Sequence, residues 1–103
     1  MVNWKKLAKL IPINVTFGRN AMYEIAWIEE FKDLKTLGET RFEPNQIVIK
    51  TKQTPRMTVI TYLHECLHAI SNECGANLTE PQILALEKAI YYVLKSNNVF
   101  KDK

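Results

Sequence analysis

The stretch Thr58–Ser71, TVITYLHECLHAIS, contains both histidines of the chain and decides how the rest of the sequence is interpreted. Within it, His64, Glu65 and His68 form an H-E-x-x-H pattern. Residues four apart are neighbours on one face of an α-helix, so the two imidazoles can bind one metal ion. Glu65 lies about 100° around the helix from His64, where it can reach a water on that ion without ligating the metal.

The surrounding residues predict the helix that this chemistry requires. Thr54-Pro55 is typical of a helix start, and Gly75 is typical of a helix end. Apolar residues at helical spacing predict a buried stripe beside the histidines, made of Ile60, Leu63, Leu67 and Ile70. The alternative is a buried helix with two incidental histidines, but the caps and the amphipathic pattern favour a metal site.

The length and composition predict one globular domain, residues 1–103, with 47 % hydrophobic residues to form a core. The net charge is +3, and the basic residues are scattered apart from two clusters. These clusters are Lys5, Lys6 and Lys9, and Lys50, Lys52 and Arg56. Such clusters are usually solvated, so contact with nucleic acid is the weaker interpretation.

The N-terminus has lysines without a long apolar segment after them, so we do not expect a signal peptide, and no apolar run is long enough to span a membrane. We therefore expect a cytoplasmic protein. Cys66 and Cys74 would lie about 12 Å apart along one helix, too far for a disulfide. We expect reduced thiols, with Cys66 packed in the core and Cys74 near the metal only if the chain folds back.

The order of the predicted elements indicates an α+β fold, a small antiparallel or mixed β-sheet packed on the H-E-x-x-H helix and a C-terminal helix. Before the motif we expect a helix at Asn3–Leu10 and strands at Ile13–Phe17, Met22–Ile28, Glu39–Glu43 and Gln46–Lys50. A helix at Ala21–Phe31 is the alternative to the second strand, but the aromatic and β-branched residues favour the strand. The last two strands should form a hairpin. After the motif, Thr79 and Gln82 predict the start of a helix that runs to about Lys95. Its expected buried stripe is Ile83, Leu86, Ile90 and Val93 or Leu94.

A catalytic zinc site usually has three protein ligands and a water, and this chain has no third histidine. On a continuous helix Glu73 would point away from the site. Glu80 and Glu87 remain, seven residues apart on one face of the next helix, and spacing alone does not separate them. Glu80 lies nearer the returning loop, although it could simply complement the helix dipole, and Glu87 could simply be solvated.

An H-E-x-x-H followed by a glutamate on the next helix resembles the zincin metallopeptidases of the gluzincin type. Their third ligand often lies in an E-x-x-A-D-like stretch, to which Glu80-Pro81-Gln82-Ile83-Leu84 is similar. The chain departs from that pattern at Leu84, where an aspartate often orients a ligand histidine. The resemblance implies that His64, His68 and Glu80 hold a zinc ion, Zn2+.

The chain more closely resembles the small metallopeptidases of bacteriophages and prophages, which are compact relatives of ImmA/IrrE-type and SprT-type domains. The resemblance rests on GETRFEPNQIVIK (38–50), TYLHECLHAISNE (61–73) and LEKAIYYVLKSN (86–97). It implies a zinc-dependent peptidase in which Glu65 is the general base. A tyrosine would stabilise the oxyanion, and we expect Tyr91, with Tyr92 and Tyr23 as alternatives.

We expect the partner to be a peptide or protein substrate, which could pair with the strand Gln46–Lys50 if that strand is a sheet edge. An alternative is a catalytically weak or inactive zincin-like protein that binds zinc and acts as a phage accessory or interaction protein; Leu84 favours it. A further alternative is a nucleic-acid-associated domain, from the lysine clusters and the SprT-like resemblance. The sequence leaves the substrate and the oligomeric state open.

Overall fold

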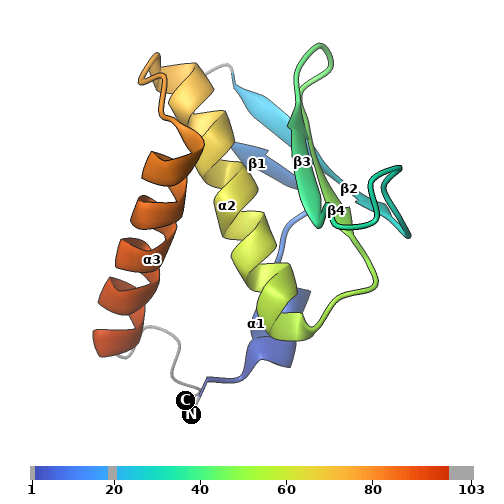
Figure 1. Cartoon of the computed structure of the whole chain (residues 1–103), viewed down its shortest axis with the longest axis vertical. Helices are drawn as coiled ribbons and strands as arrows, with labels where there is room; N and C mark the ends of the chain where they lie inside the picture. Colours follow the sequence, from blue (N-terminus) through green and yellow to red (C-terminus); the bar gives the residue numbers. More distant parts are fainter. Residues whose placement is uncertain (1, 19–20, 98–103) are drawn as a thin grey trace.

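The structure is a computed structural model that describes residues 2–18 and 21–97, and it has the predicted α+β architecture. Helix α1 and strands β1 and β2 come first, followed by the β3–β4 hairpin and the long helices α2 and α3 (Figure 1). Their bounds are α1 Trp4–Lys9, β1 Asn14–Thr16, β2 Met22–Ile28, β3 Gly38–Arg41, β4 Gln46–Lys50, α2 Pro55–Cys74 and α3 Glu80–Ser96. Among the described residues, no helix combines the length and the apolar character needed to cross a membrane.

The four strands form a mixed sheet in the order β1-β2-β4-β3. Strands β2 and β4 are parallel, with Ile25 opposite Ile47, and the other two pairs are antiparallel. The hairpin predicted from β3 and β4 is confirmed. The expectation that Gln46–Lys50 could accept a substrate strand is wrong, because β4 lies inside the sheet, with β2 paired on one side and β3 on the other. The edge strand of the hairpin is β3.

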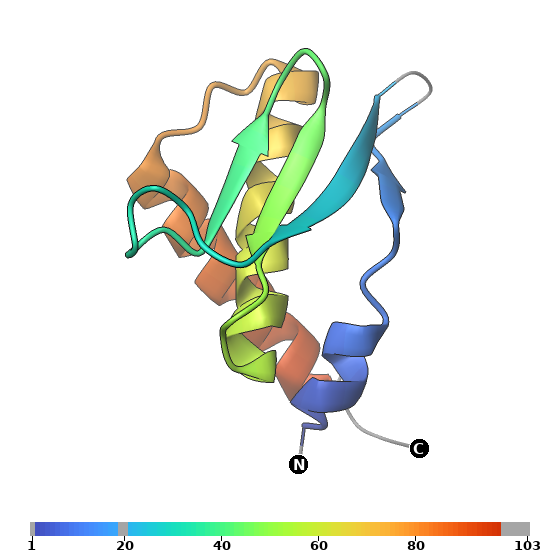
Figure 2. The same cartoon turned by 90° about the vertical axis from the view of Figure 1, so that its right-hand side faces the viewer.

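Helix α2 lies between the sheet and α3 (Figure 1). Turned by 90°, the molecule presents the sheet in front of α2, and among the described residues no helix lies over the sheet's outer face (Figure 2). The core forms where α2 meets the sheet. It is built from Tyr23, Ile25, Ile47 and Ile49 of the sheet and Cys66 and Ala69 of α2.

The predicted ends of α2 are confirmed. The Thr54 side chain accepts a hydrogen bond from the Met57 N–H, and Gly75 ends the helix in the left-handed conformation with φ 67°. The predicted apolar stripe is only partly right, because Leu67 is buried while Ile70 is 37 % exposed. The sheet covers a different side of α2, on which small and polar residues such as Thr61, Glu65 and Ala69 are buried. That side allows a strand to approach the helix closely.

Helix α3 begins with the predicted capping box between Thr79 and Gln82. Its predicted buried stripe is only partly right: Ile83 is buried and Leu94 is half-buried, but Leu86, Ile90 and Val93 are 40 %, 36 % and 60 % exposed. Helix α3 packs mainly on α2, with Tyr91 also stacked on Trp4 of α1, and it places two glutamates rather than its apolar flank against the histidines. The side of α3 that faces α2 therefore carries the buried Ile83 together with two glutamates.

Candidate metal centre

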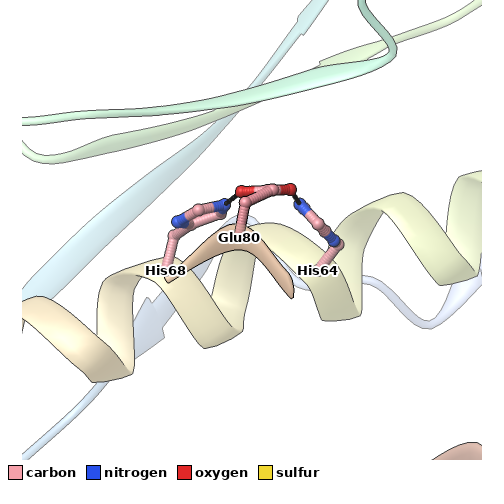
Figure 3. Close-up of side chains that lie close together, drawn as sticks. All are labelled: His64, His68 and Glu80. Carbon is pink, nitrogen blue, oxygen red and sulfur yellow. Dashed lines mark ion pairs between the residues drawn. The ribbon is translucent and has the colours of Figure 1, made fainter. Parts of the chain in front are cut away.

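Helix α2 presents His64 and His68 toward α3, with their ring centroids 5.0 Å apart. Glu80, in the first turn of α3, lies opposite both rings and joins the two imidazoles (Figure 3). Its Oε1 is 2.7 Å from His64 Nε2, and its Oε2 is 2.9 Å from His68 Nε2. One ligand atom from each of the three residues lies within 4.8 Å of the others. The structure thus brings together the three residues that we expected to bind the metal.

The turn between the two helices carries Glu80 back to the histidines. Gly75 reverses the chain, and the Leu78 N–H donates a hydrogen bond of 2.8 Å to the Ser71 hydroxyl in the last part of α2. The capping box at Thr79 then starts α3 immediately before Glu80. Local hydrogen bonds therefore fix the first turn of α3 beside the face of α2 that carries the motif.

Glu87 contacts the other nitrogen of His64, with Oε1 at 3.2 Å from Nδ1, and its side chain is only 14 % exposed. Both ring nitrogens of His64 lie beside a carboxylate oxygen, Nε2 beside Glu80 and Nδ1 beside Glu87. In the tautomer with its proton on Nδ1, His64 donates to Glu87 and leaves Nε2 to bind a metal. The two glutamates that spacing left equivalent thus differ: Glu80 contacts the Nε2 atoms of both histidines, and Glu87 contacts Nδ1 of His64.

Glu65 lies on the sheet side of the motif and is only 6 % exposed. Its Oε1 accepts a hydrogen bond from Thr40 Oγ1 at 2.9 Å, across from strand β3. Burial raises the pKa of the Glu65 carboxyl, while the Thr40 hydrogen bond and the two histidines act in the opposite direction. A cavity of about 340 Å³ contains Glu65, both histidines and Glu80, with β3 as its opposite wall.

Two residues that position Glu65 were not singled out from the sequence. A Cβ on Gly38 would lie 2.5 Å from Thr61 Cγ2 and 3.1 Å from Glu65 Cγ, so only glycine lets β3 approach α2 here. Thr40, two residues further along β3, points the same way and fixes Glu65 Oε1. Residues two apart in a strand lie on the same face, which could have linked Gly38 and Thr40. The sequence alone did not show that this face of β3 packs against α2.

The expected oxyanion residue lies elsewhere. Tyr91 stacks on Trp4, with ring centroids 5.8 Å apart, and lines a different cavity from the one that holds the histidines. Tyr92 lines that same cavity, and the Tyr23 hydroxyl donates a hydrogen bond of 2.7 Å to Glu73 in the core region. The expectation for Tyr91 is therefore corrected, and none of the three tyrosines lines the histidine cavity.

The two cysteines also lie outside the site. Cys66 is buried in the core as expected, and burial raises the pKa of its thiol to about 11. Cys74 is exposed at the end of α2 and is not among the described residues that could together hold an ion. No cysteine therefore belongs to the donor set.

The donor set fits a divalent first-row metal. Two imidazole nitrogens and a carboxylate oxygen are a set that zinc binds, although other metals of the series accept it too. Both Nε2 atoms point at Glu80 instead of at unrelated partners, so they already converge on one point. No protein-family model, curated protein or solved structure matches this chain. The functional argument therefore rests on the site itself.

Proposed function

We propose that the protein is a zinc-dependent peptidase in which His64, His68 and Glu80 hold the metal and Glu65 is the general base. The observation that carries this proposal is the convergence of both Nε2 atoms on the Glu80 carboxylate, with a buried glutamate beside them in the same cavity. The resemblance to small phage-type metallopeptidases agrees with this assignment and adds the expectation of a peptide or protein substrate.

Zinc bound there would lower the pKa of a coordinated water toward neutrality and polarise the carbonyl of the scissile bond. Glu65 would act as the general base, accepting a proton from the attacking water and passing it to the leaving amine. Its Oε1 already accepts from Thr40, and no described residue donates a hydrogen bond to Oε2. This supports Oε2 as the atom that carries the proton. Glu87 holds the His64 ring through Nδ1, the role for which the family often uses an aspartate at the position of Leu84.

Strand β3 supports an extended peptide as the substrate. It is the edge of the sheet beside the histidine cavity. The Lys50 N–H donates to the Leu37 carbonyl, so in the antiparallel register the backbone groups of Gly38 and Thr40 point away from β4. A substrate strand could pair with those outward groups, as we had expected for β4.

A catalytically weak or inactive zinc-binding interaction protein is the second candidate. It is favoured by the low exposure of Glu65, 6 %, because a base that works on a substrate must reach it. In either case we propose the cytoplasm as the compartment, because both cysteines are free thiols in the structure.

The test is proteolysis of an unfolded protein such as reduced casein by the zinc-loaded wild type and Glu65→Gln. Glu65→Gln should bind as much zinc as wild type and cleave at least about 100-fold more slowly, because only the base is lost. Cleavage by Glu65→Gln at the wild-type rate would contradict the assignment. Zinc binding by both proteins without any cleavage would favour the second candidate.

A further inference from the structure

Three neighbouring cavities, which we call together the groove, follow one another from the histidine cavity along α2 and α3. Next to that cavity lies a second one of about 320 Å³, which shares His64 and Glu65 with it. A third cavity of about 360 Å³ shares Ile60 and Glu87 with the second. Because neighbouring cavities have lining residues in common, they lie next to one another, and one extended ligand could reach all three.

The second cavity is mainly apolar. Its apolar side chains come from the loop before β3 and from both long helices: Leu37, Met57, Ile60 and Leu84. Leu84, which replaces the acid of the resembling family, is 42 % exposed and therefore available for contact. A site of this size and lining fits a large apolar side chain next to the histidine cavity.

The third cavity carries positive charge. Arg56 and Lys88 line it together with Tyr91 and Tyr92. Within the described part of the chain, neither cation forms an ion pair with a carboxylate. Arg56 lies over the Trp4 ring, 5.8 Å from its centroid, which supports the wall formed by Tyr91 on the same indole.

The one carboxylate near these cations is directed elsewhere. Glu87 lines the third cavity, but its Oε1 contacts His64 Nδ1. At the opposite end, in the histidine cavity, Glu39 pairs with Arg41 and Glu80 joins the two histidines. Arg56 and Lys88, which have no carboxylate partner among the described residues, therefore lie at the far end of the groove, beyond the apolar section.

We propose that the groove binds an extended peptide that places a large apolar side chain in the second cavity and an acidic side chain at Arg56 and Lys88. Charge complementarity at the far end and the apolar section select this ligand over one with the opposite charge. A nucleic acid fits less well, because the groove offers few cations for phosphate contacts and its second cavity is mainly apolar. The position of the scissile bond in this peptide rests on the proposed function, whereas the binding preference does not.

The experiment uses the zinc-loaded full chain with Glu65→Gln, so that binding is measured without cleavage. The probes are fluorescein-labelled ten-residue peptides with one central leucine. Each peptide carries a single aspartate or a single lysine, placed two, three or four residues before or after the leucine, and is otherwise uncharged. Fluorescence anisotropy should show that the best aspartate peptide binds about two- to fivefold more tightly than its lysine counterpart. The difference should shrink in 0.5 M salt.

Charge reversal locates the basic end. Adding Lys88→Glu should reverse the preference in favour of the lysine peptide. The control Lys9→Glu, at an exposed position of α1 that does not line the groove, should leave the preference unchanged. Leu84→Ala should weaken the leucine peptide about fivefold and leave a peptide with a central alanine almost unaffected. Equal binding of the two charged peptides, no binding at all, or the same response to Lys9→Glu would overturn the proposal.

Cleavage of the same peptides by wild type separates this inference from the proposed function. Binding with the expected charge preference but without cleavage would support the groove and contradict the peptidase. Cleavage that ignores charge in both wild type and Lys88→Glu would support the peptidase and overturn the groove.

Discussion

The two faces of α2 contact very different surroundings. Toward the sheet, Cys66 and Ala69 pack against Tyr23, Ile47 and Ile49 in an apolar core. Toward α3, His64 and His68 meet two glutamates. One face can supply most of the stability of the domain, so the other can hold charged groups together at a cost in stability. Glu65 and Thr61 lie at the boundary, where strand β3 approaches the helix.

The largest effect on stability should come from the core face. Ile47 is fully buried, and Ile47→Ala should lower the free energy of unfolding by about 2 to 5 kcal/mol because it leaves a cavity. Urea denaturation should show this loss equally with zinc and with EDTA. Ile13→Ala, at a side chain that is 79 % exposed, should change stability by less than about 0.5 kcal/mol. A loss in Ile47→Ala that disappears with zinc would show that the two faces are not independent.

Gly38 tests the boundary between the faces. A methyl group there would lie 2.5 Å from Thr61 Cγ2, so Gly38→Ala should cost about 1 to 3 kcal/mol as the strand and the helix move apart. Because Glu65 is the other neighbour, peptidase activity should also fall while the zinc content stays at the wild-type level. A matched Gly18→Ala substitution would not be a clean control, because Gly18 has φ 85° and an alanine there would be strained. Wild-type activity in Gly38→Ala would contradict this account.

Glu87 tests the polar face. Glu87→Ala should weaken zinc binding about 10- to 100-fold, because His64 loses the carboxylate at its Nδ1. Glu87→Gln should have a smaller effect, since an amide oxygen still accepts that hydrogen bond. Competition titration with a chromogenic chelator measures the affinity, and Leu84→Ala is the control one turn away on the same helix. Equal losses in Leu84→Ala and Glu87→Ala would point to a general disturbance of α3.

The smallest effect concerns Tyr23 at the other side of the core. Burial and the hydrogen bond to Glu73 raise the pKa of Tyr23 to about 12 in the folded protein. The neutral phenol therefore favours the folded state, and this contribution is present below pH 10 and is lost as the pH rises from about 10 to 12. Denaturation at pH 9 and pH 11.5 should show a larger loss for wild type than for Tyr23→Phe. An identical loss in both proteins would contradict this assignment.

Local signals were sufficient to predict the helices. Thr54, Gly75 and the Thr79–Gln82 box each satisfy backbone groups at a helix end, so they set the ends of α2 and α3 before any tertiary contact is known. The β3–β4 hairpin was also predictable from local sequence, because only a short turn separates its two strands. The H-E-x-x-H spacing alone placed two candidate ligands on one face.

Long-range contacts decided what the sequence could not. The parallel pairing of β2 with β4 puts β4 inside the sheet, and no local pattern specifies that pairing. The seven-residue spacing of Glu80 and Glu87 allowed either to be the ligand, and only the crossing of α3 over α2 assigned them to different nitrogens of His64. The exposure of Leu86, Ile90 and Val93 was not predicted, because apolar residues at helical spacing usually mark the side of a helix that packs against the protein.

Zinc binding to the purified full chain is the most direct test of the central claim. Isothermal titration calorimetry and metal analysis should be performed on wild type, His64→Ala, Glu80→Gln and the exposed control Glu29→Gln. We predict one zinc per chain in wild type and Glu29→Gln, none in His64→Ala, and clearly weaker binding in Glu80→Gln. Failure of the folded wild type to bind zinc, or unchanged binding in Glu80→Gln, would contradict the account.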